Sequence, residues 1–191
     1  MTDFLTITEV GDYIGRDLSA DDGAILAVSM ACETVRSLTE QDFQPTTGAV
    51  AVLDGTGTDC LLLPQTPVTA AGTVAIDGTA LAATDYKVTS EGELFRTDGT
   101  ATWADNGGYP ASPVAYWPQG RRNISVTYDY GYAGTAPDDV RMVALAIATR
   151  LITQGGAVQE TVGQVSKRYA AAATDLTNGE RAILRRYKQP R

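Results

Sequence analysis

The stretch NISVTYDYGYAGTAPDDV, residues 123–140, joins two residue patterns with different periods. From Ile124 to Tyr130 every second side chain is large and apolar or aromatic, which is typical of a β-strand with one buried face. Pro137 and the two aspartates after it are typical of the first turn of a helix. Proline lacks an N–H that would have no partner there, and carboxylates favour the positive helix end. The stretch therefore predicts a strand followed closely by a helix.

Two helices with matching apolar stripes are predicted on either side of a β-rich region. The earlier stripe consists of Ala24, Ile25, Val28, Ala31, Cys32, Val35 and Leu38, and the later one of Val140, Val143, Ala144, Ile147 and Leu151. Spacings of three and four residues place each set on one side of a helix, and such a stripe needs an apolar partner. We expect the two helices to pack against each other, although the whole β-rich region separates them in sequence.

Capping patterns predict where three helices begin. Thr6–Glu9, Ser19–Asp22 and Thr177–Glu180 each begin with a hydroxyl side chain and have an acid three residues later. We therefore expect a short N-terminal helix, a long helix capped by Ser19, and a terminal helix.

Between the two long helices the sequence is rich in Gly, Pro, Thr and Val, which favours short strands and turns. Asp77-Gly78 and Glu91-Gly92 are expected to form hairpin turns, because glycine suits positions with positive φ. The run Asp54–Asp59 lacks the bidentate Glu of an EF-hand and the Gly-Lys-Ser/Thr of a phosphate loop, so we expect a glycine-rich hairpin turn there too. The Gly-, Asn- and Pro-rich segment 97–116 is expected to be a long projecting or disordered loop rather than part of the core.

These patterns together predict an α+β fold. It consists of a helical bundle with a β-rich insertion of short hairpins between the long N-terminal helix and its later partner helix, plus a C-terminal arm. We assign residues 1–47 and 135–154 to the bundle, residues 48–134 to the insertion, and residues 155–191 to the arm, which ends in a helix. A chain of 191 residues suffices for such a fold but not for two full-sized enzymatic domains.

Composition excludes several function classes. The chain has no histidine, which removes Ser-His-Asp and Cys-His nucleophile systems and the commonest zinc ligand. Cys32 and Cys60 lie among apolar neighbours and are expected to be small buried hydrophobes. No cofactor or metal site is expected. No apolar run is long enough to cross a membrane, and residues 1–8 lack the order of a signal peptide, so we expect a cytosol-like compartment.

The charge is divided between an acidic body and a basic C-terminal segment. Residues 1–159 hold 8 Lys and Arg against 20 Asp and Glu, whereas residues 160–191 hold 7 against 3. The net charge of −8 argues against a protein that grips nucleic acid by neutralising phosphates. The asymmetry is typical of an interaction segment, or of a solvated terminal helix with complementary charge. We expect residues 160–191 to be an assembly arm, loosely ordered in the free protein and fixed on docking.

The order of the predicted elements resembles one protein family. The pieces are two N-terminal helices, the second ending near QDF (41–43), the runs LLLPQTPV (61–68), VAIDG (74–78), YKV (86–88) and WPQG (117–120), and the stretch 124–140. In this order they resemble the head-to-tail connector (adaptor, or head-completion) proteins of long-tailed double-stranded DNA bacteriophages. The resemblance covers residues 6–151 and is most specific over residues 124–140, whereas the loop 97–116 and the segment 155–173 depart from the family pattern.

This resemblance implies a structural virion protein, made in the host cytoplasm, that forms a ring at the head-to-tail junction, commonly of twelve subunits. The ring would dock under the portal protein and receive a stopper or tail-completion protein on its far side. Genomic DNA would pass through without specific binding, since acidic surfaces repel phosphate. Neither an enzymatic activity nor a membrane partner is expected. The residues expected to contact the portal or a neighbouring subunit are Lys167, Arg168, Tyr169, Arg181, Ile183, Leu184, Arg185, Arg186 and Tyr187.

Two other function classes remain open. A β-rich peptide- or glycan-binding module would use an aromatic cleft around Trp103 and Trp117. A carboxylate-based hydrolase would need two acids about 5 to 10 Å apart in a cleft, and no residue pattern requires such a pair. The adjacent acids at 21–22 and 138–139 are explained by their places in the first turns of helices.

Overall fold

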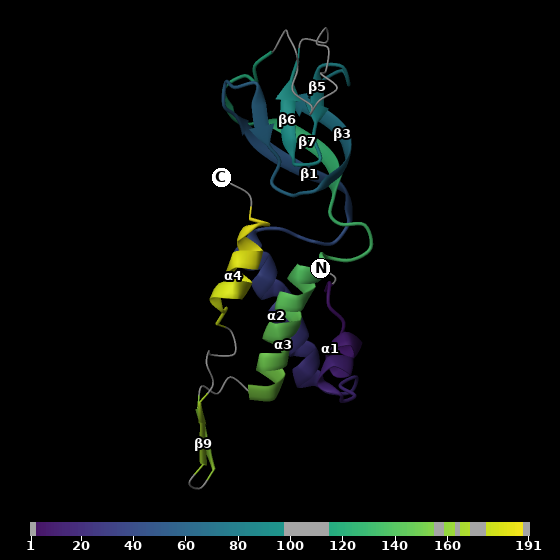
Figure 1. Cartoon of the computed structure of the whole chain (residues 1–191). Helices are drawn as coiled ribbons and strands as arrows, with labels where there is room; N and C mark the ends of the chain where they lie inside the picture. The colour runs from purple at the N-terminus through teal and green to yellow at the C-terminus, as the bar shows by residue number, and fades with distance from the viewer. Residues whose placement is uncertain (1–2, 98–114, 155–158, 163–164, 169–174, 189–191) are drawn as a thin grey trace. The chain divides into compact units, whose positions relative to one another are not determined.

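The computed structural model describes residues 3–97, 115–154, 159–162, 165–168 and 175–188 (Figure 1). The chain divides into two compact units. One contains residues 1–44 and 134–191 and is called the helical unit below; the other contains residues 45–133 and is called the β unit.

Four helices lie in the described part of the helical unit: α1 (Ile7–Ile14), α2 (Asp22–Thr39), α3 (Asp138–Gln154) and α4 (Asn178–Arg185). The two long helices, α2 and α3, pack against each other, and α1 and α4 each contact both of them. The predicted pairing of these two helices across the β-rich region is confirmed. The short helices α1 and α4 flank this pair on two sides (Figure 1).

The apolar stripes account for the α2–α3 contact, although the stripe on α2 is narrower than predicted. Val28, Cys32 and Val35 are buried on α2, and Val143 and Ile147 are buried on α3. In contrast, Ile25 and Leu38 of the predicted stripe are 41% and 42% exposed. Neighbouring residues of a helix point about 100° apart, so one side of α2 faces α3 while the stripe's outer members reach the surface.

Capping side chains start the helices, in one case from a different residue than predicted. Thr6 accepts a hydrogen bond from the Glu9 N–H (3.2 Å), and the Glu9 carboxylate accepts one from the Thr6 N–H (2.8 Å). Thr177 and Glu180 form the same reciprocal pair before α4. Ser19 does not cap α2: the cap is Asp21, whose carboxylate accepts from the Ala24 N–H at 3.0 Å. The N–H of Ser19 instead donates to Asp17 in the preceding turn, so the helix begins two residues later.

The β unit contains two antiparallel sheets. The strands, within the described residues, are β1 (Thr46–Gly55), β2 (Cys60–Leu62), β3 (Val68–Ile76), β4 (Thr79–Ala80), β5 (Tyr86–Val88), β6 (Glu93–Arg96) and β7 (Gly120–Tyr130). One sheet has the order β1-β7-β3-β4 and the other the order β2-β6-β5. The α+β fold class, with its sheets between α2 and α3 in the sequence, is therefore confirmed.

The alternating strand predicted over 124–130 is the centre of the larger sheet. In β7, Ile124, Val126 and Tyr128 are at most 2% exposed and belong to one core cluster with residues of the second sheet, including Leu94. Trp117, just before β7, is fully buried in the same cluster, and its indole N–H donates to the Leu94 carbonyl at 3.2 Å. The side chains at every second position of the predicted strand thus face the core.

Two of the three predicted hairpin turns are confirmed. Asp77 and Gly78 have φ values of 49° and 81° between β3 and β4, as a tight turn with two positive φ angles requires. Gly92, with φ of 85°, lies between β5 and β6. The run Asp54–Asp59 does not make a hairpin, because it connects β1 of one sheet to β2 of the other. The predicted loop 97–116 falls mostly on residues 98–114, which lie outside the described residues.

A further antiparallel pair lies in the segment between α3 and α4. Strands β8 (Gln159–Val162) and β9 (Val165–Arg168) pair from Gln159 with Arg168 to Val162 with Val165. They form a separate two-stranded sheet and extend neither sheet of the β unit.

Candidate functional site

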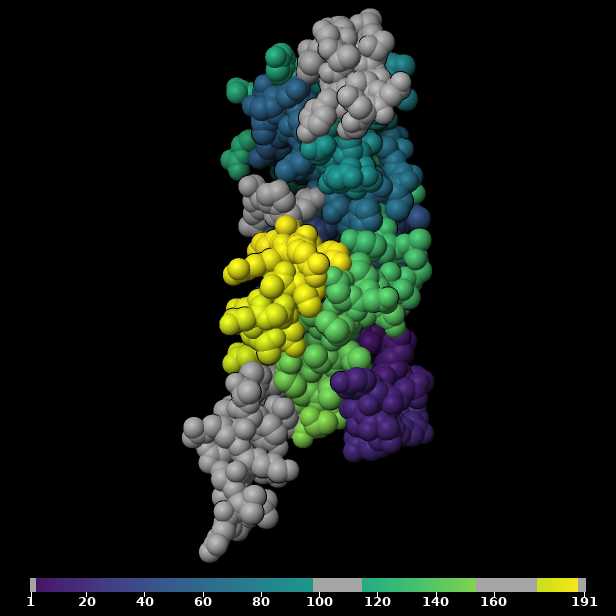
Figure 2. All heavy atoms as spheres, in the orientation of Figure 1, coloured from purple at the N-terminus to yellow at the C-terminus, as the bar shows by residue number. Residues whose placement is uncertain are grey.

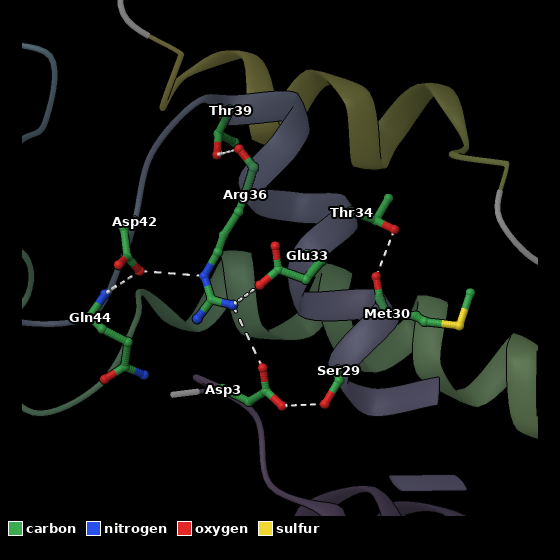
Figure 3. A network of polar contacts seen from close by, with 9 residues as sticks. All are labelled: Asp3, Ser29, Met30, Glu33, Thr34, Arg36, Thr39, Asp42 and Gln44. Carbon is green, nitrogen blue, oxygen red and sulfur yellow. Dashed lines mark hydrogen bonds and ion pairs between the residues drawn. The ribbon is translucent and has the colours of Figure 1, made fainter. Parts of the chain in front are cut away.

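A buried arginine organises the face of α2 near the N-terminal segment (Figure 3). The guanidinium of Arg36 is only 6% exposed and lies 2.6 Å from Glu33, 3.4 Å from Asp42 and 3.6 Å from Asp3. It also lies over the ring of Phe4, 5.3 Å from its centroid. Burial by itself would lower the pKa of Arg36, but the hydrogen bond to Glu33 and the nearby carboxylates outweigh it and raise the pKa.

This network has a structural role. Asp3 and Phe4 precede α1, whereas Asp42 follows α2, so one side chain holds two chain segments against the helix. Phe4 and Phe43 meet edge to face at 5.7 Å beside it. Three carboxylates surround this one cation, so the guanidinium ties the N-terminal segment and the segment after α2 to the same side of the helix.

The C-terminal helix α4 is held on α3 by a second arginine. The two outer nitrogens of Arg150 lie 2.7 and 3.2 Å from the two carboxylate oxygens of Glu180, and Arg150 also donates to the Asp175 carbonyl at 3.2 Å. Both side chains of this pair are largely buried. Burial would raise the pKa of Glu180, but the hydrogen bonds from Arg150 and Thr177 outweigh it and hold the pKa below its ordinary value.

The end of the α4 segment is bound to the helical unit by polar and aromatic contacts. Tyr187 donates to Asp139 at 2.7 Å, and Arg186 pairs with the same carboxylate at 3.1 Å. The ring of Tyr187 also meets Phe43 edge to face at 5.7 Å. Figure 2 shows α4 seated against the surface of α3. This packing differs from the expectation that all of residues 160–191 are loosely ordered in the free protein.

The structure places the predicted contact residues in two groups. Lys167 and Arg168 lie on β9, and Tyr169 lies outside the described residues. The other six lie on α4 or just after it. Within that second group Leu184 is buried in its own unit, whereas Arg181 and Arg185 are exposed.

A groove that the sequence patterns did not reveal lies between α2 and α4. Its wider part has a volume of about 520 Å³. Leu38 of α2, Leu176 and Arg181 line both parts of this groove, together with Met30 at one end and Leu184, Arg185 and Lys188 at the other. Met30 and Leu38 are 46% and 42% exposed, although Leu38 belongs to the predicted apolar stripe of this helix. This α2–α4 groove is a candidate surface for a protein partner.

The two cysteine thiols are not activated by their surroundings. Burial raises the pKa of both thiols, Cys32 and Cys60, to about 11, so neither is an activated nucleophile. No cluster of three or more acids and cysteines that could hold a metal ion occurs in the part of the chain that the structure describes. None of the described helices is both long and apolar enough to span a bilayer.

The alternative aromatic cleft loses one of its two tryptophans. Trp117 is fully buried, with its indole N–H bonded inside the β unit, and therefore cannot line an open site. Trp103 lies outside the described residues.

Of the adjacent acids considered for a carboxylate-based hydrolase, Asp139 accepts a hydrogen bond from Tyr187 and pairs with Arg186.

Comparison with known proteins shows the fold. No protein-family model and no curated protein matches this sequence. Among solved structures, a chain in the neck of a native gene transfer agent particle, a neck computed with C12 symmetry, is 14% identical, with a TM-score of 0.57, over 97% of this chain and 88% of that chain. A chain in the neck of an empty gene transfer agent particle, computed with C6 symmetry, is 17% identical, with the same TM-score, over 97% of this chain and 89% of that chain. The protein therefore shares the fold of these neck chains over nearly its whole length.

Proposed function

We propose that this protein is a structural component of the neck of a phage-like particle. It forms a ring, of twelve subunits, that docks under the portal protein and bridges to a stopper or tail-completion protein while DNA passes through the channel. The observation that carries the proposal is the fold shared with the two neck chains across 97% of this chain. A sixfold symmetry, as in the second of these particles, is contained in a twelvefold one.

The charge and the chemistry of the chain support a conduit. A net charge of −8 disfavours tight duplex binding, because affinity grows with every phosphate that a cation neutralises. The chain has no histidine, and burial raises the pKa of both thiols to about 11, which disfavours nucleophilic catalysis by a His-activated group or a thiolate. A scaffold that positions other proteins needs neither tight DNA binding nor a catalytic nucleophile.

The β8–β9 hairpin is our candidate for the portal contact. A two-stranded hairpin is at best marginally stable in water by itself, and a third strand or a packed surface stabilises it. Among the described strands, the hairpin pairs with neither sheet of the β unit, so an outer edge of it could add a strand from a partner. Lys167 and Arg168 lie on β9, and Tyr169 follows them.

The test is a mass measurement of the purified protein, alone and mixed with the portal ring of the same particle. A complex of the portal ring with twelve copies of this chain is expected. A chain that neither forms a ring nor joins the portal would refute the proposal.

The hairpin contact is tested by replacing residues 159–168 with a Gly-Ser linker of equal length. This change leaves α4 and its contacts with Arg150 and Asp139 in place, so the helical unit should melt as the wild type does. Portal binding should weaken by at least about tenfold. The matched control is Met142→Ser on the exposed side of α3, which should bind normally. Normal portal binding by the linker variant would show that the hairpin is not the contact.

A further inference from the structure

The α2–α4 groove combines an apolar floor with a basic rim. Leu38 and Leu176 line both of its parts, and the cations Arg181 and Arg185 stand on the α4 side. Glu33 also lines it, but its carboxylate is bonded to Arg36 at 2.6 Å. An occupant that fits would present an apolar or aromatic side chain beside carboxylates.

Such a surface exists on the same unit, at helix α1. Tyr13 is 67% exposed, and its neighbours Asp12 and Asp17 are exposed carboxylates. Arg16, the cation between them in sequence, already pairs with Asp21 at 3.6 Å. The α1 end is therefore an acidic surface with one protruding aromatic ring.

The two surfaces lie on different sides of the α2–α3 pair, because α1 and α4 flank that pair (Figure 1). Two different and complementary surfaces on one subunit make a heterologous, head-to-tail contact. Repetition of such a contact closes into a ring when the rotation between subunits allows it. A contact of one surface with itself would instead place like charges together.

We propose that helix α1 of one copy docks into the α2–α4 groove of the next copy, with Tyr13 on the apolar floor formed by Leu38 and Leu176. Asp12 and Asp17 of the first copy face Arg181 and Arg185 of the second. This inference rests on the proposed ring-forming function and assigns the subunit interface within it. It also gives Met30 and Leu38, the exposed apolar side chains of α2 that line the groove, a partner.

Cross-linking between two differently labelled variants tests the contact. Tyr13→Cys and Leu38→Cys are each placed in a Cys60→Ser background, while Cys32 is fully buried and stays. A short bis-maleimide added to the assembled mixture should join chains of the two variants. Neither variant alone should cross-link, and Met142→Cys, on the exposed side of α3 in the same unit, should not link to Leu38→Cys. Absence of the mixed product, or linkage of Leu38→Cys to itself, overturns the proposal.

Charge reversal provides a second test. Arg181→Glu with Arg185→Glu, and separately Asp12→Lys, should each raise the concentration needed for half-assembly by about tenfold or more, and their combination should restore part of the loss. All these positions are exposed, so thermal melting should be unchanged. Equal assembly of wild type and reversed variants contradicts the interface. If the wild-type protein forms rings that bind the portal but the two cysteine variants do not cross-link, only the proposed interface is wrong. If the two variants cross-link but the wild-type protein does not bind the portal, the proposed function is wrong.

Discussion

Replacing Glu180 by Gln should weaken the packing of α4 on the helical unit without unfolding the unit. Glu180 joins α4 to Arg150 of α3 through two hydrogen bonds of 2.7 and 3.2 Å. The variant keeps the size of the side chain and removes its charge. Arg150 then retains its bond to the Asp175 carbonyl but loses its anionic partner.

The expected cost follows from burial. Glu180 and Arg150 are 12% and 17% exposed. Removing one partner of a fully buried ion pair costs about 3 to 5 kcal/mol. Because glutamine still accepts a hydrogen bond and some water reaches the pair, we expect about 2 kcal/mol, which corresponds to a roughly 30-fold increase in the open population of α4.

Hydrogen exchange measured amide by amide is the assay. The α4 amides should exchange roughly 30-fold faster in Glu180→Gln, while those of β7 in the other unit should stay unchanged. The matched control is Glu40→Gln, since Glu40 pairs with Lys188 at 3.0 Å and both side chains are well exposed. That pair should contribute at most about 0.5 kcal/mol, or about a twofold change.

The pH dependence provides an independent check. The pKa of Glu180 lies below its ordinary value of 4.5, so its contribution to docking is complete above pH 4.5 and is lost as the pH falls through the folded-state pKa. The wild type should therefore lose α4 protection on acidification, and Glu180→Gln should lose less. Unchanged exchange in Glu180→Gln, or an equal increase in both variants, would refute this account of α4 docking.

Three further predictions concern the core, the N-terminal segment and DNA. Ile147→Ala should destabilise the protein by about 3 kcal/mol in urea unfolding, because Ile147 is fully buried between the long helices, whereas Met142→Ala should be close to neutral. Arg36→Met should cost about 2 to 3 kcal/mol in the same assay, because three carboxylates lose their cation; wild-type stability would contradict the role assigned to the network. The assembled ring should bind duplex DNA weakly, with any residual binding lost across a salt series; sub-micromolar affinity at physiological salt would contradict a conduit.

Features that depend on neighbouring residues were predictable from the sequence. The turn at Asp77-Gly78 and the capping pair of Thr6 and Glu9 each involve residues at most three apart, so the sequence contains all participants. The alternation over 124–130 and the apolar stripes of α2 and α3 each mark the side of a strand or helix that is buried in the structure. The fold class follows from these periods because a strand or a helix with one apolar face must bury it.

Which residue caps a helix and which strands pair with each other were decided only by the tertiary structure. The capping pattern predicted Ser19 as the cap, but in the turn after α1 the Ser19 N–H bonds to Asp17, and Asp21 caps the helix instead. Asp54–Asp59 has the composition of a hairpin turn, yet it connects two sheets, because the partner of β1 is the distant β7.

The candidate surface shows the same limit. The helical period marks Leu38 as a core residue, and only the positions of α3 and α4 leave it in an open groove. The basic residues on and after α4 were visible as a charge excess, but the pairing of Arg186 with Asp139 and of Lys188 with Glu40 was not. Local periodicity determines that a side of a helix is apolar or charged. Which neighbour covers that side depends on contacts between residues far apart in the chain, and these arise only when the helices pack.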